Sequence, residues 1–305
     1  MTLSRPITQA ASALRGKFRE VRAASLALAA PLSAEDQCIQ SMPDASPTKW
    51  HLAHTTWFFE TVLLQPHAAG YRPFDERFHY LFNSYYEALG PRHPRPQRGL
   101  LTRPSVDEVH AYRAHVDEAV LALLDGGDSE RDWAAIEPIV TLGLHHEQQH
   151  QELLLTDILH ALSCNPLLPA CRPAAGPALR LAAVPPAMHW LPQPGGMVQV
   201  GHEGPQQGFA FDNETPRHAA LLQPYAIADR LVSCGDYAQF IADGGYQRPE
   251  LWLSDGWAAV QAQGWRHPAY WLAADDPRLQ AQQPQGGWQV FGLHGVRPME
   301  ADAPV

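Results

Sequence analysis

The sequence predicts a protein of class α + (α+β), with a four-helix bundle followed by a smaller domain of mixed helices and strands. Three observations support this prediction. The first half contains four long segments with apolar residues at helical spacing. A stretch dense in proline and glycine follows at 165–196, and short apolar runs between turn residues come after it. A chain of 305 residues has the usual length for about two domains.

Each expected helix of the first half has Pro, Asp or Ser near its start, and these residue types favour a helix N-terminus. A long connection separates the second helix from the third. Helices of this length predict a bundle, in which side chains on facing helices can build a site. The expected helices are 7–30, 47–64, 105–124 and 133–163.

The proline-rich stretch predicts the domain boundary. Proline lacks the backbone donor of a helix and clashes with the preceding turn, so this stretch cannot sustain a helix. We therefore expect the bundle at 1–165, a linker at 166–194 and the second domain at 195–305.

The second domain is expected to combine strands with a short capped helix at 233–245. Its strands are predicted within 195–201, 219–233 and 288–295. Tryptophans are frequent amid its loop-like sequence, and we interpret them as packing anchors. They are Trp190, Trp252, Trp257, Trp265, Trp271 and Trp288.

Composition limits the partners. The formal net charge is −10, whereas nucleic acids and anionic membranes attract clustered lysine and arginine. We therefore expect no nucleic-acid partner and no membrane partner, and no apolar run approaches the length of a membrane span. Residues 22–34 are faintly similar to a signal-peptide core, but charged residues in 7–30 favour an amphipathic helix. The 4 cysteines form no C-x-x-C pair, which favours a reducing cytoplasm.

Two pairs of histidines suggest a metal site. His146 and His150 are four residues apart, so on a helix they lie about 40° apart on one face and can share an ion. His51 and His54 lie on another apolar helix of the same expected bundle. A structural role is the simpler interpretation of either pair alone. The presence of both pairs favours a metal held between facing helices.

A second motif overlaps the first. His146, Glu147 and His150 satisfy H-E-x-x-H, in which zinc proteases place two ligands and a general base. We do not favour a protease, because the sequence after the motif offers no third ligand typical of that class. Nearby aromatic residues are interpreted as core that also walls the site: Trp50, Trp57, Phe58 and Phe59.

The loop "GPRHPRPQRG" at 90–99 concentrates arginines in an otherwise acidic protein. Arg92, Arg95 and Arg98 suit either a solvated loop or a clamp for carboxylates, which arginine binds bidentately. These residues alone do not decide between the two interpretations.

Several motifs taken together resemble a known family. "SPTKWHLAHTTWFFE", "FNSYYEALGPRHPRPQRGLL" and "LGLHHEQQHQELLLTDI" resemble the sulfoxide synthases of ergothioneine biosynthesis. "GGMVQVGHEG" and the sequence from "FAFDNETPRH" to "ELWLSDGW" resemble their second domain, which is related to the formylglycine-generating enzymes. The resemblance implies a DinB-like four-helix bundle followed by part of a C-type-lectin-like domain.

The resemblance also implies the site residues. The family's non-haem Fe(II) is held by three histidines, which here correspond to His54, His146 and His150. Glu152 completes the H-x-x-x-H-x-E motif, but it lies about 200° around the helix from His150 and is not expected to be a ligand. His51 is then structural or supports a ligand.

The family's substrates map onto other positions. Its H-P-R-x-x-R loop, which binds the carboxylates of the thiol substrate, corresponds to Arg95 and Arg98. Gln149, before the second helix histidine, corresponds to a residue near the imidazole of hercynine. The implied reaction joins hercynine to γ-glutamylcysteine or cysteine with O2, forming a C–S bond and a sulfoxide.

Family members continue beyond the position of Val305 into a segment that supplies a catalytic tyrosine. By that comparison we expect this chain to be truncated and its turnover to be low. Two alternatives remain: a DinB-like thiol transferase that uses zinc or nickel without O2, and a catalytically incomplete fragment that binds only metal or thiol.

Overall fold

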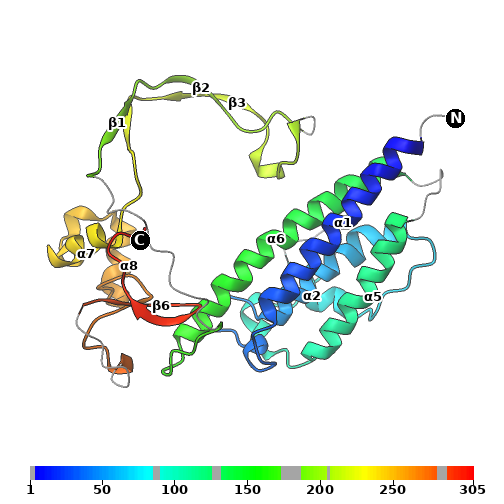
Figure 1. Ribbon diagram of the computed structural model, residues 1–305, viewed down its shortest axis with the longest axis horizontal. Coiled ribbons are helices and arrows are strands. Elements are labelled where there is room, and N and C mark those ends of the chain that lie inside the picture. The colour runs from blue at the N-terminus through cyan, green and yellow to red at the C-terminus, as the bar shows by residue number, and fades with distance from the viewer. Residues whose placement is uncertain (1–3, 85–89, 126–131, 173–186, 205–206, 280–286) are drawn as a thin grey trace. The chain divides into compact units, whose positions relative to one another are not determined.

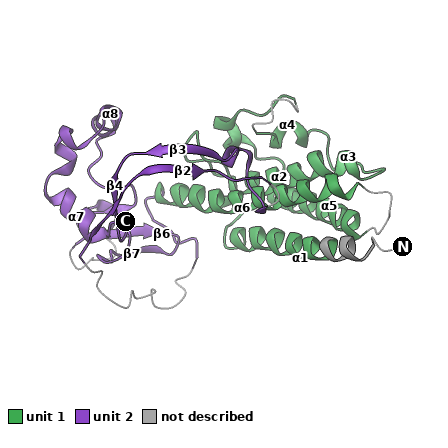
Figure 2. Ribbon diagram, turned by 90° about the horizontal axis from the view of Figure 1, so that it is seen from above, with its two compact units in different colours: residues 1–164 green, residues 165–305 purple. Residues whose placement is uncertain are grey.

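A computed structural model describes residues 4–84, 90–125, 132–172, 187–204, 207–279 and 287–305. The chain divides into two compact units, Met1–Cys164 and Asn165–Val305 (Figure 2). The first is helical and the second contains small sheets, so the expected order of a helical part followed by a sheet-containing part is confirmed. Among the described residues, no helix combines the length and apolar character needed to cross a membrane.

Four long helices dominate the first unit, close to the expected ranges (Figure 1). The helices α1 and α2 each pack against both α5 and α6. A π-helical segment, Phe59–Leu64, and the short α3, Gln65–His67, extend α2. The long helices are α1 (Ser4–Ala29), α2 (Thr48–Phe58), α5 (Val106–Asp125) and α6 (Trp133–Ser163).

Three shorter segments occur in the described connections between these helices. They are a 3₁₀ turn at Asp36–Cys38, the short α4 at Phe78–Phe82, and a 3₁₀ segment at Arg95–Leu100 in the arginine-rich loop.

The core of the first unit surrounds α2, and every residue of α2 is buried. Gly143 on α6 allows the closest approach to it. A Cβ atom at this position would lie 2.5 Å from the Phe59 ring and 2.8 Å from the Phe58 ring. Glycine therefore lets α6 pack closely against these rings one turn before His146. This packing fixes the position of α6 along its axis relative to α2.

The second unit contains three small antiparallel sheets within its described residues. Strand β1 (Trp190–Gln193) pairs with β4 (Tyr225–Ala228), and β2 (Gly196–Val200) pairs with β3 (His218–Leu222). The third sheet has the order β5–β6–β7. Its strands are Trp271–Leu272, Gln289–Gly292 and Gly295–Pro298.

In the described part of this unit two helices accompany the strands, α7 (Cys234–Ala242) and α8 (Ser254–Gln263). The Oγ atom of Ser233 accepts from the backbone of Asp236, and the Asp236 carboxylate accepts from the Ser233 N–H, so α7 begins with the expected cap. Short 3₁₀ turns complete the described unit at Asp212–Glu214, Gly245–Gln247, Pro249–Leu251 and Pro277–Leu279.

Two features of the second unit differ from expectation. Strand β1 lies within the expected linker, because Trp190–Gln193 pairs with a strand more than thirty residues later, which local composition does not reveal. The tryptophans are also not uniformly packing anchors. Trp271 is 4% exposed, whereas Trp190 is 65% exposed on its two-stranded sheet.

Candidate metal centre

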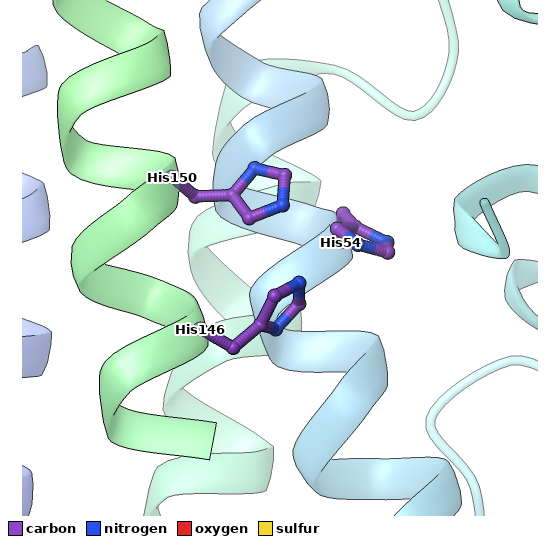
Figure 3. A group of neighbouring side chains, drawn as sticks. All are labelled: His54, His146 and His150. Carbon is purple, nitrogen blue, oxygen red and sulfur yellow. The ribbon is translucent and has the colours of Figure 1, made fainter. Parts of the chain in front are cut away.

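Three imidazoles meet between two helices of the first unit. His54 comes from α2, and His146 and His150 come from successive turns of α6 (Figure 3). One nitrogen from each ring lies within 4.8 Å of the others. The ring centres are 4.6–5.0 Å apart. The four-residue spacing and the packing of α2 on α6 therefore bring together the three histidines named from the sequence.

The three imidazoles are neutral at pH 7. Burial lowers the pKa of His146 to about 4. Burial also lowers the pKa of His54 and of His150 well below the ordinary value, and neighbouring imidazoles add to the effect. A neutral imidazole keeps one nitrogen lone pair available for a metal. The cluster is therefore a set of three nitrogen donors, the type of ligand that iron, zinc, nickel and copper accept.

The hydrogen bonds of two rings indicate which nitrogen remains for an ion. The Nδ1 atom of His54 donates to the carbonyl of Phe82 at 2.5 Å, which leaves its Nε2 atom. The Nδ1 atom of His150 lies 2.8 Å from the Nδ1 atom of His51, which also leaves Nε2. The Nδ1 atom of His146 is buried without a hydrogen-bond partner among the described residues.

Aromatic rings wall the cluster, as the sequence suggested. The indoles of Trp50 and Trp57 both stack on the His54 ring, nearly parallel to it, with ring centres 4.6 and 5.5 Å away. The ring of Phe58 lies 5.2 Å from that of His146. These rings limit the movement of the imidazoles and keep water from this side of the cluster.

The predicted substrate residues lie in different surroundings. Arg98 is 4% exposed, and its guanidinium lies 3.4 Å from the centre of the Trp50 ring. It donates to the hydroxyls of Ser46 and Ser84. Its charge is close enough to contribute to the lowered pKa of His54, after burial and His146.

Arg95 and Gln149 are less closely tied to the cluster. Arg95 is half-buried, and its guanidinium donates to the carbonyl of Asp44. Gln149 is exposed on α6. Glu152 is exposed as well, as its position on the helix predicts. The structure therefore brings Arg98 beside the histidines, and it places Arg95 on the neighbouring loop.

The protease interpretation of H-E-x-x-H does not fit Glu147. This carboxylate is 1% exposed and faces away from the histidines, toward α1 and α5. It accepts hydrogen bonds from Arg22, Arg113 and Ser25 at 2.9, 2.9 and 2.6 Å. Burial opposes its ionisation, but the two guanidiniums outweigh burial and lower its pKa to about 2. A carboxylate held in this way is not a general base.

Sequence reasoning missed two partnerships at the site. One is this buried ion cluster, whose members lie on three helices. The other is the contact of His51 with His150 and Asp157. The sequence held a weak indication of the His51 contacts. Asp157 follows His150 by two helical turns, so the two residues lie on the same face of the helix.

Acid should destabilise the metal-free first unit between about pH 6.5 and 4. His146 titrates near 6.5 when unfolded and near 4 when folded. Within this window the unfolded chain binds more protons, so the free energy of unfolding falls as pH falls. One such histidine contributes a slope of at most about 1.4 kcal/mol per pH unit. Denaturant titrations followed by helical circular dichroism at several pH values measure the slope. The variant His146→Asn should show a shallower slope, and an equal slope would contradict this prediction.

Comparisons with known proteins identify two regions. Residues 17–154 match the DinB superfamily model, and residues 182–286 match the sulfatase-modifying factor enzyme 1-like domain. The chain is 30% identical over 237 residues to a hercynine oxygenase of Mycolicibacterium thermoresistibile, covering 75% of this chain and 48% of that protein. It is 30% identical over 248 residues to the hercynine oxygenase of Mycobacterium tuberculosis, covering 79% and 53%.

A third hercynine oxygenase, of Mycolicibacterium smegmatis, is 28% identical over 242 residues, covering 76% of this chain and 51% of that protein. The chain thus spans about half the length of the curated relatives it matches. The expected resemblance to the ergothioneine sulfoxide synthases is confirmed by these relatives and by the two domain matches.

Proposed function

We propose that this chain carries the metal centre of an ergothioneine-pathway sulfoxide synthase. In this proposal Fe(II) binds to His54, His146 and His150, and hercynine is joined to γ-glutamylcysteine or cysteine with O2. The observation that carries the proposal is the convergence of three neutral imidazoles within 4.8 Å. The relatives are hercynine oxygenases, which supports hercynine as the substrate.

The donor set fits Fe(II) held by the chain in an open site. Three neutral histidines would supply three nitrogen ligands to the ion, and its remaining ligands would come from substrates. Bound iron would supply the oxygen-dependent chemistry of C–S bond formation and sulfoxidation. The chain itself holds the three rings in place, through the Phe82 carbonyl for His54 and through His51 for His150. The indoles of Trp50 and Trp57 exclude water beside His54.

The domain organisation belongs to the same proposal. We assign a DinB-like four-helix bundle to 1–165, a linker that ends in strand β1 to 166–194, and part of a C-type-lectin-like, formylglycine-generating-enzyme-like domain to 195–305. The mutual packing of α1, α2, α5 and α6 supports the first assignment. The match at 182–286 supports the last.

We propose that Arg95 and Arg98 provide positive charge for the carboxylates of the thiol substrate, and that Gln149 lies near the hercynine imidazole. Replacing Arg95 with Ala should weaken thiol binding by about 1.5–3 kcal/mol, the usual loss for a charged hydrogen bond. That corresponds to roughly 10- to 150-fold in Kd. Isothermal titration of the metal-loaded chain with γ-glutamylcysteine measures it.

Arg98 needs a milder change, because its guanidinium also supports Trp50. The variant Arg98→Lys keeps the charge and loses the planar fork, so thiol affinity should fall with little loss of metal. Arg103→Ala is the matched control, since Arg103 is an exposed arginine shortly after the same loop. Equal thiol affinity in Arg95→Ala, Arg98→Lys and the parent would contradict the clamp.

The proposed reaction is tested directly. The chain is loaded with Fe(II) without oxygen, mixed with hercynine and either thiol, and exposed to O2, with mass spectrometry for a sulfoxide conjugate. An oxygen-dependent conjugate supports the proposal. Thiol transfer with zinc or nickel in the absence of O2 would indicate the DinB-like transferase instead. Metal uptake without either product would assign a binding role only.

A further inference from the structure

A chain of hydrogen bonds leads from a carboxylate to the candidate ligand His150. The Oδ2 atom of Asp157 lies 3.0 Å from the Nε2 atom of His51. The Nδ1 atom of His51 lies 2.8 Å from the Nδ1 atom of His150. His51 is 3% exposed, so its ring is closed off from water. The contacts link α2 to α6 beside the three-histidine cluster.

Donor and acceptor roles follow from the chemistry of these groups. The backbone N–H of Ser46 donates to the same Oδ2 atom of Asp157 at 2.8 Å, so this oxygen is an acceptor. Its other partner, the Nε2 atom of His51, is therefore the donor. A neutral imidazole with its proton on Nε2 has a lone pair on Nδ1. The Nδ1 atom of His150 must then carry a proton and donate it, which leaves the lone pair of His150 on Nε2.

We infer that His51 and Asp157 are positioning residues that hold His150 in the tautomer protonated on Nδ1, with Nε2 free to bind a metal. This inference rests on the proposed metal site. Ligating histidines commonly donate their second nitrogen to a carboxylate or carbonyl, which fixes the ring and raises its basicity. His54 uses the Phe82 carbonyl for this purpose. His150 uses a carboxylate through one intervening imidazole.

A structural role alone does not account for the arrangement. The Asp157 carboxylate accepts hydrogen bonds from Ser46 and His51, so Asp157 would have its hydrogen-bond partners without His150. The remaining nitrogen of His51 is nevertheless directed at the one nitrogen of His150 that faces away from the cluster. The relay therefore controls the protonation of a candidate ligand and not only the packing of α2 on α6.

The tautomer of His150 is the first measurement. In the full metal-free chain labelled with ¹⁵N-histidine, long-range proton–nitrogen correlation spectra distinguish Nδ1–H from Nε2–H, and His150→Gln assigns the signals. We expect Nδ1–H in the parent. Asp157→Leu removes the acceptor of His51, so the tautomer of His51 is no longer fixed and His150 should shift partly toward Nε2–H. His51→Asn keeps an acceptor oxygen near the position of Nδ1 and should retain Nδ1–H.

Metal affinity is the second measurement, with Co(II) as the probe and a chelator as competitor. Asp157→Leu and His51→Gln should weaken binding by roughly 10- to 100-fold, as is typical for groups that orient a ligand. His51→Asn should bind more tightly than His51→Gln. Glu137→Gln is the matched control, because it removes an exposed carboxylate from the same helix, and it should bind like the parent.

The outcomes separate this inference from the proposed function. An Nε2–H tautomer in the parent, or an unchanged tautomer in folded Asp157→Leu, would overturn the positioning role. Weaker Co(II) binding with no change of tautomer would overturn it as well. The expected tautomers in a chain that binds no Co(II) would support the relay and would overturn the metal site on which the proposed function depends.

Discussion

Replacing His146 with alanine should abolish tight metal binding by the chain. The loss should exceed the roughly 10- to 100-fold that follows when a group orienting a ligand is removed, because a ligand itself disappears. Two imidazoles would remain, His54 and His150, and they come from different helices. His146 is the most suitable of the three for this test, because it is only partly buried and makes no hydrogen bond through Nδ1 to a described residue.

The measurement is anaerobic Fe(II) binding by chelator competition, with circular dichroism to establish that the variant is folded. The sequence provides a close control in His145, the neighbouring residue of α6, which lies outside the three-histidine cluster. The variant His145→Ala should keep the metal. Glu152→Gln should keep it too, since this carboxylate is exposed. Retention of Fe(II) by His146→Ala at parental affinity would remove His146 from the ligand set, and oxygen-dependent product formation should be lost together with the metal.

The parts of this fold that sequence predicts are those set by local periodicity. Apolar spacing placed the four long helices within a few residues of their ends, because burial of one helix face repeats with the helical turn. The same periodicity placed His146 and His150 on one face of α6. His54 required the family resemblance, because spacing alone allowed either His51 or His54 to face the pair.

The parts that sequence did not predict depend on partners far apart in the chain. His51 touches His150 and Asp157, about a hundred residues later, only because α2 packs on α6. Strand β1 exists because it pairs with β4. Arg98 lies in a loop of mostly polar residues, which predicts exposure, but packing on Trp50 buries the Arg98 side chain. Each of these contacts is created by tertiary packing, which the local pattern does not contain.

Glu147 is another residue whose partners lie far away in the chain, and we expect these partners to make it important for stability. In the sequence Glu147 belongs to the metal-binding motif H-E-x-x-H, because it lies between His146 and His150. In the structure it is the shared acceptor of two buried guanidiniums, Arg22 from α1 and Arg113 from α5. Arg22 also pairs with Asp117 at 2.6 Å. One carboxylate of α6 thus joins three helices on the side opposite the histidines.

Replacing Glu147 with leucine should lower the free energy of unfolding of the first unit by roughly 3–5 kcal/mol, the usual cost of removing one partner of a buried ion pair. Arg113 would keep its buried charge and lose its carboxylate, and Arg22 would keep only Asp117 as a partner. Urea titration followed by helical circular dichroism measures the loss. The control Glu137→Gln should change stability by less than about 0.5 kcal/mol, as for an exposed site.

A second comparison separates the cost of unpaired charge from the cost of changed packing. The quadruple variant Arg22→Met, Arg113→Met, Asp117→Leu, Glu147→Leu removes the whole cluster, including the partner of Arg22, and leaves no unpaired ion in it. It should be more stable than Glu147→Leu alone, because well-packed apolar residues often replace a buried ion cluster at little cost. A quadruple variant as unstable as the single variant would show that the shape of this side of α6, and not its charge, holds the helices.

The pH dependence of the free energy of unfolding distinguishes the charge of Glu147 from its packing. Glu147 has its pKa lowered to about 2 against an ordinary value of 4.5. Its contribution to stability is therefore fully present above about pH 4.5 and is lost as pH falls toward 2. The parent and Glu147→Leu should differ most near neutral pH and converge in acid. A difference in the free energy of unfolding that stays constant down to pH 2 would mean that the Glu147 side chain acts through packing. The charge of Glu147 would then not set the position of α6 or of the histidines on α6.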